Sequence, residues 1–195
     1  MIVVLVGYLI FESFIYLVQA QTQVTVTATV PTSITCTLST TQTSFGTIDP
    51  SQVWTSSPNV TTTVSCNPAA GCQVQIRDQG NGTNGGLYKS DNPTYLIPSP
   101  AAGFPATATL VAGTEGYGIQ ATTTSAGSGG TLTLNSIYNQ TGNTVGRLST
   151  TTVILASSTQ PVANREIVVI HKAAVSSLTP AGSYQDTITY SCSSN

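Results

Sequence analysis

The sequence predicts an all-β protein, a β-sandwich that follows an N-terminal hydrophobic segment. Three observations lead to this fold class. Apolar and polar residues alternate in short runs, which is the period of a half-buried strand. Val, Ile, Thr and Tyr, which suit a pleated surface, are abundant after residue 20. No run of good helix formers follows that residue, so alternating helices and strands are not expected.

The composition indicates a single folded domain. Of the 195 residues, 39% are hydrophobic and 6% are charged. Disordered chains combine low hydrophobicity with high net charge, whereas this chain has a formal net charge of −2. Because no cluster of Lys or Arg occurs, nucleic acid is not expected as a partner.

The expected strands are separated by residues typical of turns. Residues 78–86 are rich in glycine and are expected to form a loop, for which a glycine-rich hairpin is favoured over a calcium-binding loop. Residues 92–105, which contain four prolines, and residues 121–130 are expected to be long surface loops. The predicted strands are residues 24–30, 34–38, 60–66, 72–77, 117–121, 131–134, 151–156, 166–171 and 185–192.

Residues 1–20 differ from the rest of the chain. An apolar stretch ends in Val18-Gln19-Ala20, which places small residues at the −3 and −1 positions of a signal-peptidase site. Cleavage there would make Gln21 the first mature residue. The alternative is a retained membrane anchor, since the stretch is just long enough to span a bilayer. With either outcome, the remaining residues are expected to be extracellular or at the cell surface.

Four cysteines lie in the exported part of the chain. An even number of cysteines in an oxidising compartment predicts two disulfides. A zinc site is less favoured, because no pair has the C-x₂₋₄-C spacing. Four cysteines allow three connectivities, and the sequence alone does not choose among them. The cysteines are Cys36, Cys66, Cys72 and Cys192.

Few residues could carry catalysis. His171 is the single histidine, and we expect it to be a strand-end residue that faces solvent. The Gly-x-Ser-x-Gly sequence of serine hydrolases does not occur. The acidic residues are isolated in sequence, so a pair of carboxylates could form only through the fold. We therefore assign no catalytic residue, no metal site and no cofactor, and we expect that the protein is not an enzyme.

Several spaced motifs resemble those of one known family. The motifs are Cys36, Ser44-Phe45-Gly46, Val64-Ser65-Cys66, residues 74–80 (VQIRDQG) and residues 181–190 (AGSYQDTITY). In this order they resemble the spore coat protein U family, which includes the pilin subunits of archaic chaperone–usher pathways. The resemblance implies an immunoglobulin-like, pilin-like sandwich that lacks its last strand and polymerises by donor-strand exchange. It also implies a periplasmic chaperone and an usher as partners, besides other copies of the chain or other pilin-like subunits.

The same resemblance implies a disulfide between Cys36 and Cys66, because the early strands of the family are linked at this spacing. That pairing leaves Cys72 with Cys192. Neither of the last two cysteines is required by the family pattern.

Two functions from different classes are compatible with the sequence. The first is an exported structural subunit of a surface fibre, pilus or coat, in which residues 21–31 form an N-terminal extension and residues 32–195 form the sandwich. Its donor strand would present Val24, Val26, Ala28 and Val30 on one face, with Thr between them. The same residues could instead form the domain's own first strand.

The second function is a stand-alone secreted β-sandwich that binds carbohydrate or another adhesive target. Aromatic side chains are the usual contacts of such a site, but they could equally fill the core. The candidate aromatic residues are Trp54, Tyr88, Tyr95, Tyr117 and Tyr138.

Overall fold

The computed structural model describes residues 22–100 and 105–195. The chain divides into two units, the first ending at Pro31 and the second comprising Thr32–Asn195. The predicted signal peptide or anchor, residues 1–20, lies outside the described residues.

Every regular element of the described residues is a β-strand. None of these residues belongs to a helix long and apolar enough to cross a membrane. The all-β prediction is therefore confirmed. The strands are β1 (Ile34–Leu38), β2 (Trp54–Thr55), β3 (Val60–Cys66), β4 (Cys72–Asp78), β5 (Gly86–Lys89), β6 (Asn92–Pro98), β7 (Thr107–Thr109), β8 (Gly116–Thr123), β9 (Ser128–Gly129), β10 (Thr133–Leu134), β11 (Thr144–Gly146), β12 (Val153–Ser158), β13 (Val162–Ala174), β14 (Tyr184–Gln185) and β15 (Ile188–Ser194).

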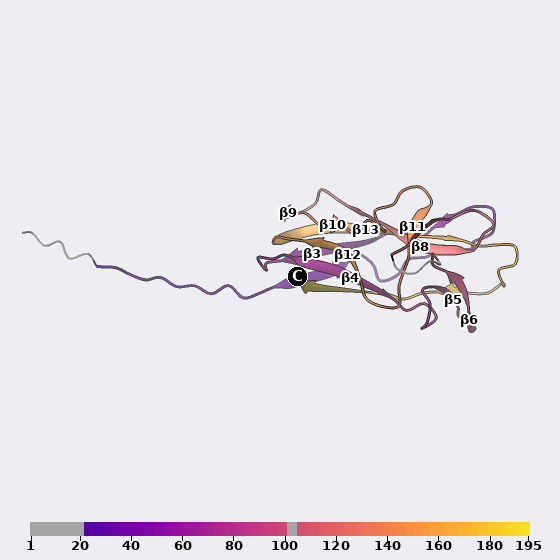
Figure 1. Ribbon diagram of the computed structural model, residues 1–195, viewed down its shortest axis with the longest axis horizontal. Helices are drawn as coiled ribbons and strands as arrows, with labels where there is room; N and C mark the ends of the chain where they lie inside the picture. The colour runs from indigo at the N-terminus through magenta and orange to yellow at the C-terminus, as the bar shows by residue number, and fades with distance from the viewer. Residues whose placement is uncertain (1–21, 101–104) are drawn as a thin grey trace, which may run out of the picture. The chain divides into compact units, whose positions relative to one another are not determined.

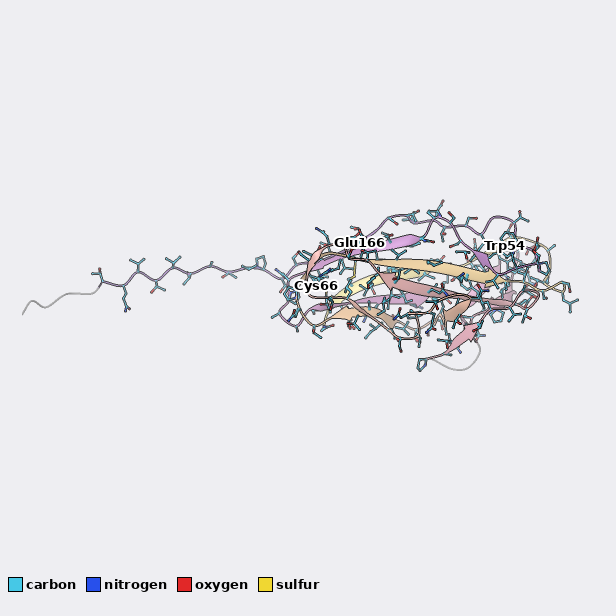
Figure 2. The ribbon with its side chains drawn as sticks, turned by 90° about the horizontal axis from the view of Figure 1, so that it is seen from above. Trp54, Cys66 and Glu166 are labelled. Carbon is cyan, nitrogen blue, oxygen red and sulfur yellow. A yellow bond between two sulfur atoms is a disulfide. The ribbon has the colours of Figure 1, made fainter. Side chains whose placement is uncertain are left out.

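Two antiparallel sheets form the layers of the sandwich (Figure 1). The first has the order β1-β3-β13-β8-β11-β7, and β2 and β9 also pair with β13. The second has the order β10-β12-β4-β15. The long strand β13 is a central strand of the first layer. Its first part pairs with β3, and β2 pairs with it near its end. Figure 2 shows the result, with Cys66 of β3 and Trp54 of β2 toward opposite ends of the sandwich.

The core lies between the two layers and follows from period-two alternation. In β3 every second side chain is buried (Val60, Thr62, Val64 and Cys66), while the Thr and Ser residues between them are half-buried. Val74 and Ile76 of β4 show the same alternation from the opposite layer. Because successive side chains of a strand point to opposite faces, each sheet buries one face against the other.

A third sheet, with the order β14-β5-β6, corrects one prediction. Residues 92–105 were expected to be a loop because of their prolines, but Asn92–Pro98 is the strand β6. The strand lies at the edge of its sheet, where a residue without an N–H group is tolerated. The glycine-rich residues 79–85 are not a hairpin either, because β4 and β5 belong to different sheets.

The disulfides correct a second prediction. The pairs are Cys36–Cys192 and Cys66–Cys72, with Cα–Cα distances of 6.2 and 6.4 Å. The expected partners, Cys36 with Cys66 and Cys72 with Cys192, lie on neighbouring strands of the same sheet.

The register of the strands explains why the expected pairs do not form. Cys36 lies opposite Val64, and Cys192 lies opposite Val74, so each cysteine is two positions away from its expected partner. Diagonal neighbours in a sheet are about 7–8 Å apart, which exceeds the usual Cα–Cα reach of a disulfide, up to about 6.8 Å. Both observed disulfides instead cross between the two layers.

Candidate functional site

One side of the sandwich is bounded by two edge strands. Among the described residues, β1 pairs only with β3 in the first sheet, and β15 pairs only with β4 in the second. The disulfide Cys36–Cys192 joins these two strands, so they border the same side of the sandwich. Within the part of the chain that the structure describes, no strand pairs with the backbone groups on the outer side of β1 or of β15. Such an edge is a template for pairing with a further strand.

The inward-facing side chains of these edge strands are incompletely covered. Ile188, Tyr190 and Cys192 of β15 contact the core but are only half-buried. Ile34 and Cys36 of β1 are half-buried as well. The side chains that point inward from the neighbouring strand β4 are buried along its whole length.

The segment after β1 extends this edge. Ser44 pairs with Ser57, so the chain continues along the outer side of the first sheet beyond β1. Phe45 and Ile48 then pack against the core while remaining half-buried. The ring of Phe45 meets that of Tyr117 edge to face, with 6.3 Å between the ring centroids. We call the half-buried apolar set the lateral edge: Ile34, Cys36, Phe45, Ile48, Ile188, Tyr190 and Cys192.

The predicted donor segment is the most exposed apolar part of the described chain. Val24, Val26 and Val30 are 88%, 89% and 81% exposed, and Ala28 is exposed too. Residues 22–33 form no strand, and the first strand of the sandwich is β1.

The five candidate aromatic residues do not gather at one place. Tyr117 and Tyr138 are buried in the core, with 2% and 0% of their surface exposed. Half-buried Trp54 donates its indole N–H to the carbonyl of Asp49. Tyr88 and Tyr95 lie on the third sheet. Their hydroxyl groups are hydrogen-bonded within the protein, Tyr88 accepting from Gln185 and Tyr95 donating to Glu115.

His171 faces the core and not the solvent. It lies within β13, and 6% of its surface is exposed. Its Nδ1 is 3.1 Å from the hydroxyl of Tyr117. Burial disfavours the charged imidazolium and lowers the pKa of His171 to about 4. The alternation along the strand could have predicted this placement, because Ile167, Val169 and His171 occupy every second position and therefore point to the same, buried face.

The fold does bring two isolated carboxyl groups together. Asp78 Oδ1 and Asp186 Oδ1 both accept a hydrogen bond from the N–H of Gly80, at 2.9 and 3.1 Å. Asp78 Oδ2 accepts a further hydrogen bond from Gly86. No group of three or more potential metal ligands (His, Cys, Asp or Glu) occurs within the described residues. Each oxygen of Asp78 thus accepts a hydrogen bond from a backbone N–H group.

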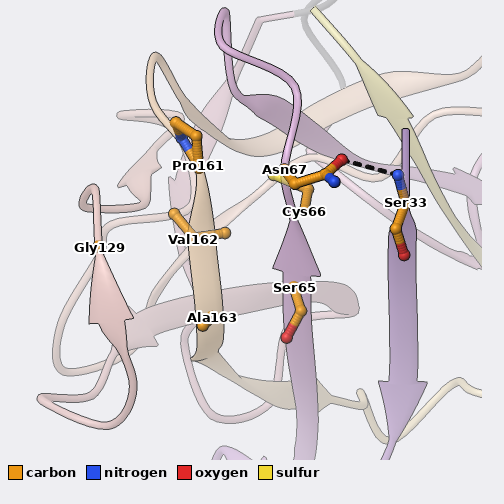
Figure 3. A pocket seen from close by; sticks show the side chains of 8 residues that line it. All are labelled: Ser33, Ser65, Cys66, Asn67, Gly129, Pro161, Val162 and Ala163. Carbon is orange, nitrogen blue, oxygen red and sulfur yellow. Dashed lines mark hydrogen bonds between the residues drawn. The ribbon is translucent and has the colours of Figure 1, made fainter. Parts of the chain in front are cut away.

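A shallow pocket of about 360 Å³ lies at one end of the first sheet (Figure 3). It is lined by the end of β3, by Gly129 of β9 and by Pro161, Val162 and Ala163. The N–H of Ser33 donates to Asn67 Oδ1 at its rim, at a distance of 2.7 Å. The lining contains no charged side chain, and Cys66 is its only residue among the sequence-predicted site residues.

No protein-family model matches this chain, and no curated protein sequence matches it.

Proposed function

We propose that the protein is an exported structural subunit of a surface fibre, pilus or coat, and that its copies assemble by donating a β-strand to one another. The half-buried lateral edge is the observation that carries this proposal. A strand inserted beside β15 would pair with its backbone groups and cover side chains that the sandwich leaves half-exposed.

Residues 22–30 of another copy have the properties of that strand. In an extended conformation Val24, Val26, Ala28 and Val30 share one face, and Thr occupies the other. Their exposure in the single chain means that assembly would remove new apolar surface from water. Burial of one Val side chain contributes about 1.5 kcal/mol.

The proposal makes the fold more specific. Residues 32–195 would form an immunoglobulin-like, pilin-like sandwich that lacks its last strand, after a donor segment at residues 21–31. The position of β15 supports this assignment, because among the described residues β15 lies at the edge of its sheet and has a free side for one more strand. The resemblance to the spore coat protein U family supports it as well, and extends the possible partners to a chaperone and an usher.

Export is supported by the two disulfides, which persist in oxidising compartments. Extracellular or cell-surface localisation is therefore part of the proposal. Residues 1–20 would act as a signal peptide or as an anchor.

A stand-alone adhesive sandwich is the competing function. The internal hydrogen bonds of Tyr88 and Tyr95 give this alternative less support. Size-exclusion chromatography separates the two functions, because a stand-alone adhesin elutes as a monomer and a strand-donating subunit forms polymers.

Deletion of residues 21–30 from the secreted protein tests strand donation directly. We expect loss of polymers in electron microscopy, with a folded monomer that retains both disulfides. A synthetic peptide of residues 21–31 should then bind this monomer and raise its Tm. A peptide carrying Val24→Asp and Val26→Asp is the matched control and should not bind.

Two results would contradict strand donation by this segment. Polymers formed by the deletion variant would mean that another surface mediates assembly. Unfolding of the deletion variant would mean that residues 22–30 belong to the subunit's own core.

A further inference from the structure

The aspartates Asp78 and Asp186 meet because their strands are paired. Asp78 is the last residue of β4, and it lies opposite Ile188, the first residue of β15. Asp186 precedes Ile188 by two residues, so the short connection between β14 and β15 carries its carboxyl group to the end of β4. The pair thus lies where the edge strand of the second sheet begins.

Backbone N–H groups hold both carboxyls in place. Gly80 donates to one oxygen of each, which requires the two carboxyl groups to lie side by side. Gly86 donates to Asp78 Oδ2 at 3.0 Å, and Thr187 donates to Asp186 Oδ1 at 2.7 Å. Asp186 Oδ2 is buried and has no hydrogen-bond partner.

No ion pair with a Lys, Arg or His side chain compensates these two carboxyl groups among the described residues. The one salt bridge among residues 22–100 and 105–195 joins Lys89 to Asp91. Arg77, the nearest cation in sequence, donates to the carbonyl of Thr150.

The titratable groups around the aspartates are neutral near pH 7. They are Tyr117 on β8, His171 on β13, Tyr190 on β15 and Tyr138. Burial raises the pKa of each tyrosine and lowers that of the histidine. Two ionised carboxylates in this place would repel each other with little screening by water.

We infer that Asp78 and Asp186 form a buried proton-binding site, in which Asp78 is un-ionised and donates a hydrogen bond to the Asp186 carboxylate. The bound proton connects the end of β4 to the short segment that precedes β15. It also fixes residues 79–86, whose Gly80 and Gly86 hold the carboxyl of Asp78. Asp78 is the member that holds the proton, because only 1% of its surface is exposed. This inference does not depend on strand donation.

The sign of the pH dependence follows from this assignment. Burial, with a smaller contribution from the neighbouring Asp186, raises the pKa of Asp78 to about 9 from the ordinary value of 3.8. The folded chain therefore binds a proton that the unfolded chain releases. The resulting stabilisation is complete below pH 4 and is lost progressively as the pH rises to about 9. His171 has the opposite sign between its folded pKa of about 4 and its ordinary value of 6.5, so His171 no longer opposes the effect of Asp78 above pH 6.5.

Infrared spectroscopy of the intact protein tests the site directly. At pH 7 we expect the C=O stretch of an un-ionised carboxylic acid, and we expect Asp78→Asn to remove it. In urea unfolding, the wild-type folding equilibrium constant should fall about tenfold for each pH unit between 6.5 and 8, and less steeply up to pH 9. This slope should be absent in Asp78→Asn. The matched control is Asp49→Asn, which changes an exposed carboxyl and should keep both the band and the slope.

The infrared measurement uses the wild-type protein, so it decides the question even if Asp78→Asn does not fold. Absence of the un-ionised band at pH 7 would overturn the inference. An unchanged band in a folded Asp78→Asn variant would overturn it as well, because the proton would then reside on a different group.

Discussion

Strands β4 and β15 are neighbours in one sheet, but their inward-facing side chains are buried to different extents. Both alternate between inward and outward side chains, and both carry a cysteine that crosses to the other layer. The inward side chains of β4, between β12 and β15, are all buried, whereas those of β15 are half-buried. The difference arises from the missing neighbour and not from side-chain type, since Ile occurs at inward positions of both strands.

The two disulfides differ in the same way, because one lies in the buried core and the other lies at the edge of both sheets. Cys66–Cys72 connects consecutive strands across a separation of 6 residues, between positions that are buried. Cys36–Cys192 connects the two edge strands across a separation of 156 residues. A covalent bond thus joins two strands that each pair with a single neighbour.

The largest effect is expected on removing the edge disulfide. In the chain-entropy description, a loop of this length contributes about 5 kcal/mol to the free energy of unfolding. We expect a loss of that order for the Cys36→Ser, Cys192→Ser variant, measured by urea unfolding under non-reducing conditions. A much smaller loss would mean that the unfolded chain is already compact around residues 36 and 192.

A smaller effect is expected on truncating the core beside β15. Ile76→Ala removes a side chain that is 1% exposed and should lower the free energy of unfolding by about 3 kcal/mol. Ile188→Ala makes the same chemical change at the edge and should cost about 1 kcal/mol, because half of the benefit of burial is absent there. Equal losses from the two variants would contradict the view that β15 lies at an open edge.

The short disulfide should matter less than the long one. For the Cys66→Ser, Cys72→Ser variant, the same description predicts a loss of about 2 kcal/mol, since a small loop restricts the unfolded chain less. The comparison with the edge-disulfide variant uses identical substitutions and identical unfolding conditions. If this variant lost more unfolding free energy than the Cys36→Ser, Cys192→Ser variant, the chain-entropy description, in which the longer loop contributes more, would be contradicted.

The smallest effect is expected in the N-terminal extension. Val26 is 89% exposed, so Val26→Thr should change the free energy of unfolding of the monomer by no more than about 0.5 kcal/mol. The matched substitution Val74→Thr places a hydroxyl in the core and should cost about 2 kcal/mol. If Val26→Thr destabilised the monomer as much as Val74→Thr, Val26 would have to pack within its own subunit.

The sequence predicted those parts of the fold that depend on local pattern. Strands β3 and β4 begin at the predicted residues, because alternation of Val or Ile with Thr or Gln is a direct record of which face is buried. Strand β6 was missed because its prolines look like loop residues until the strand is known to lie at a sheet edge.

The features that could not be predicted depend on which strands are neighbours in the sheets. A local sequence pattern does not contain this information. The disulfide connectivity could not be chosen without assigning each cysteine to a layer. The pairing of Asp78 with Asp186 required the register between β4 and β15. In both cases, residues far apart in sequence meet only after the sheets have formed.

The Cys36–Cys192 bond has a mechanical consequence. It closes a covalent ring that contains nearly all of the sandwich and leaves residues 22–35 outside. Tension applied between the N-terminal extension and the end of β15 would pass through the sulfur atoms, and the strands inside the ring would not be stretched. In a filament whose subunits are pulled through these two segments, each subunit would resist extension as a covalent link and not as a folded domain that can unravel.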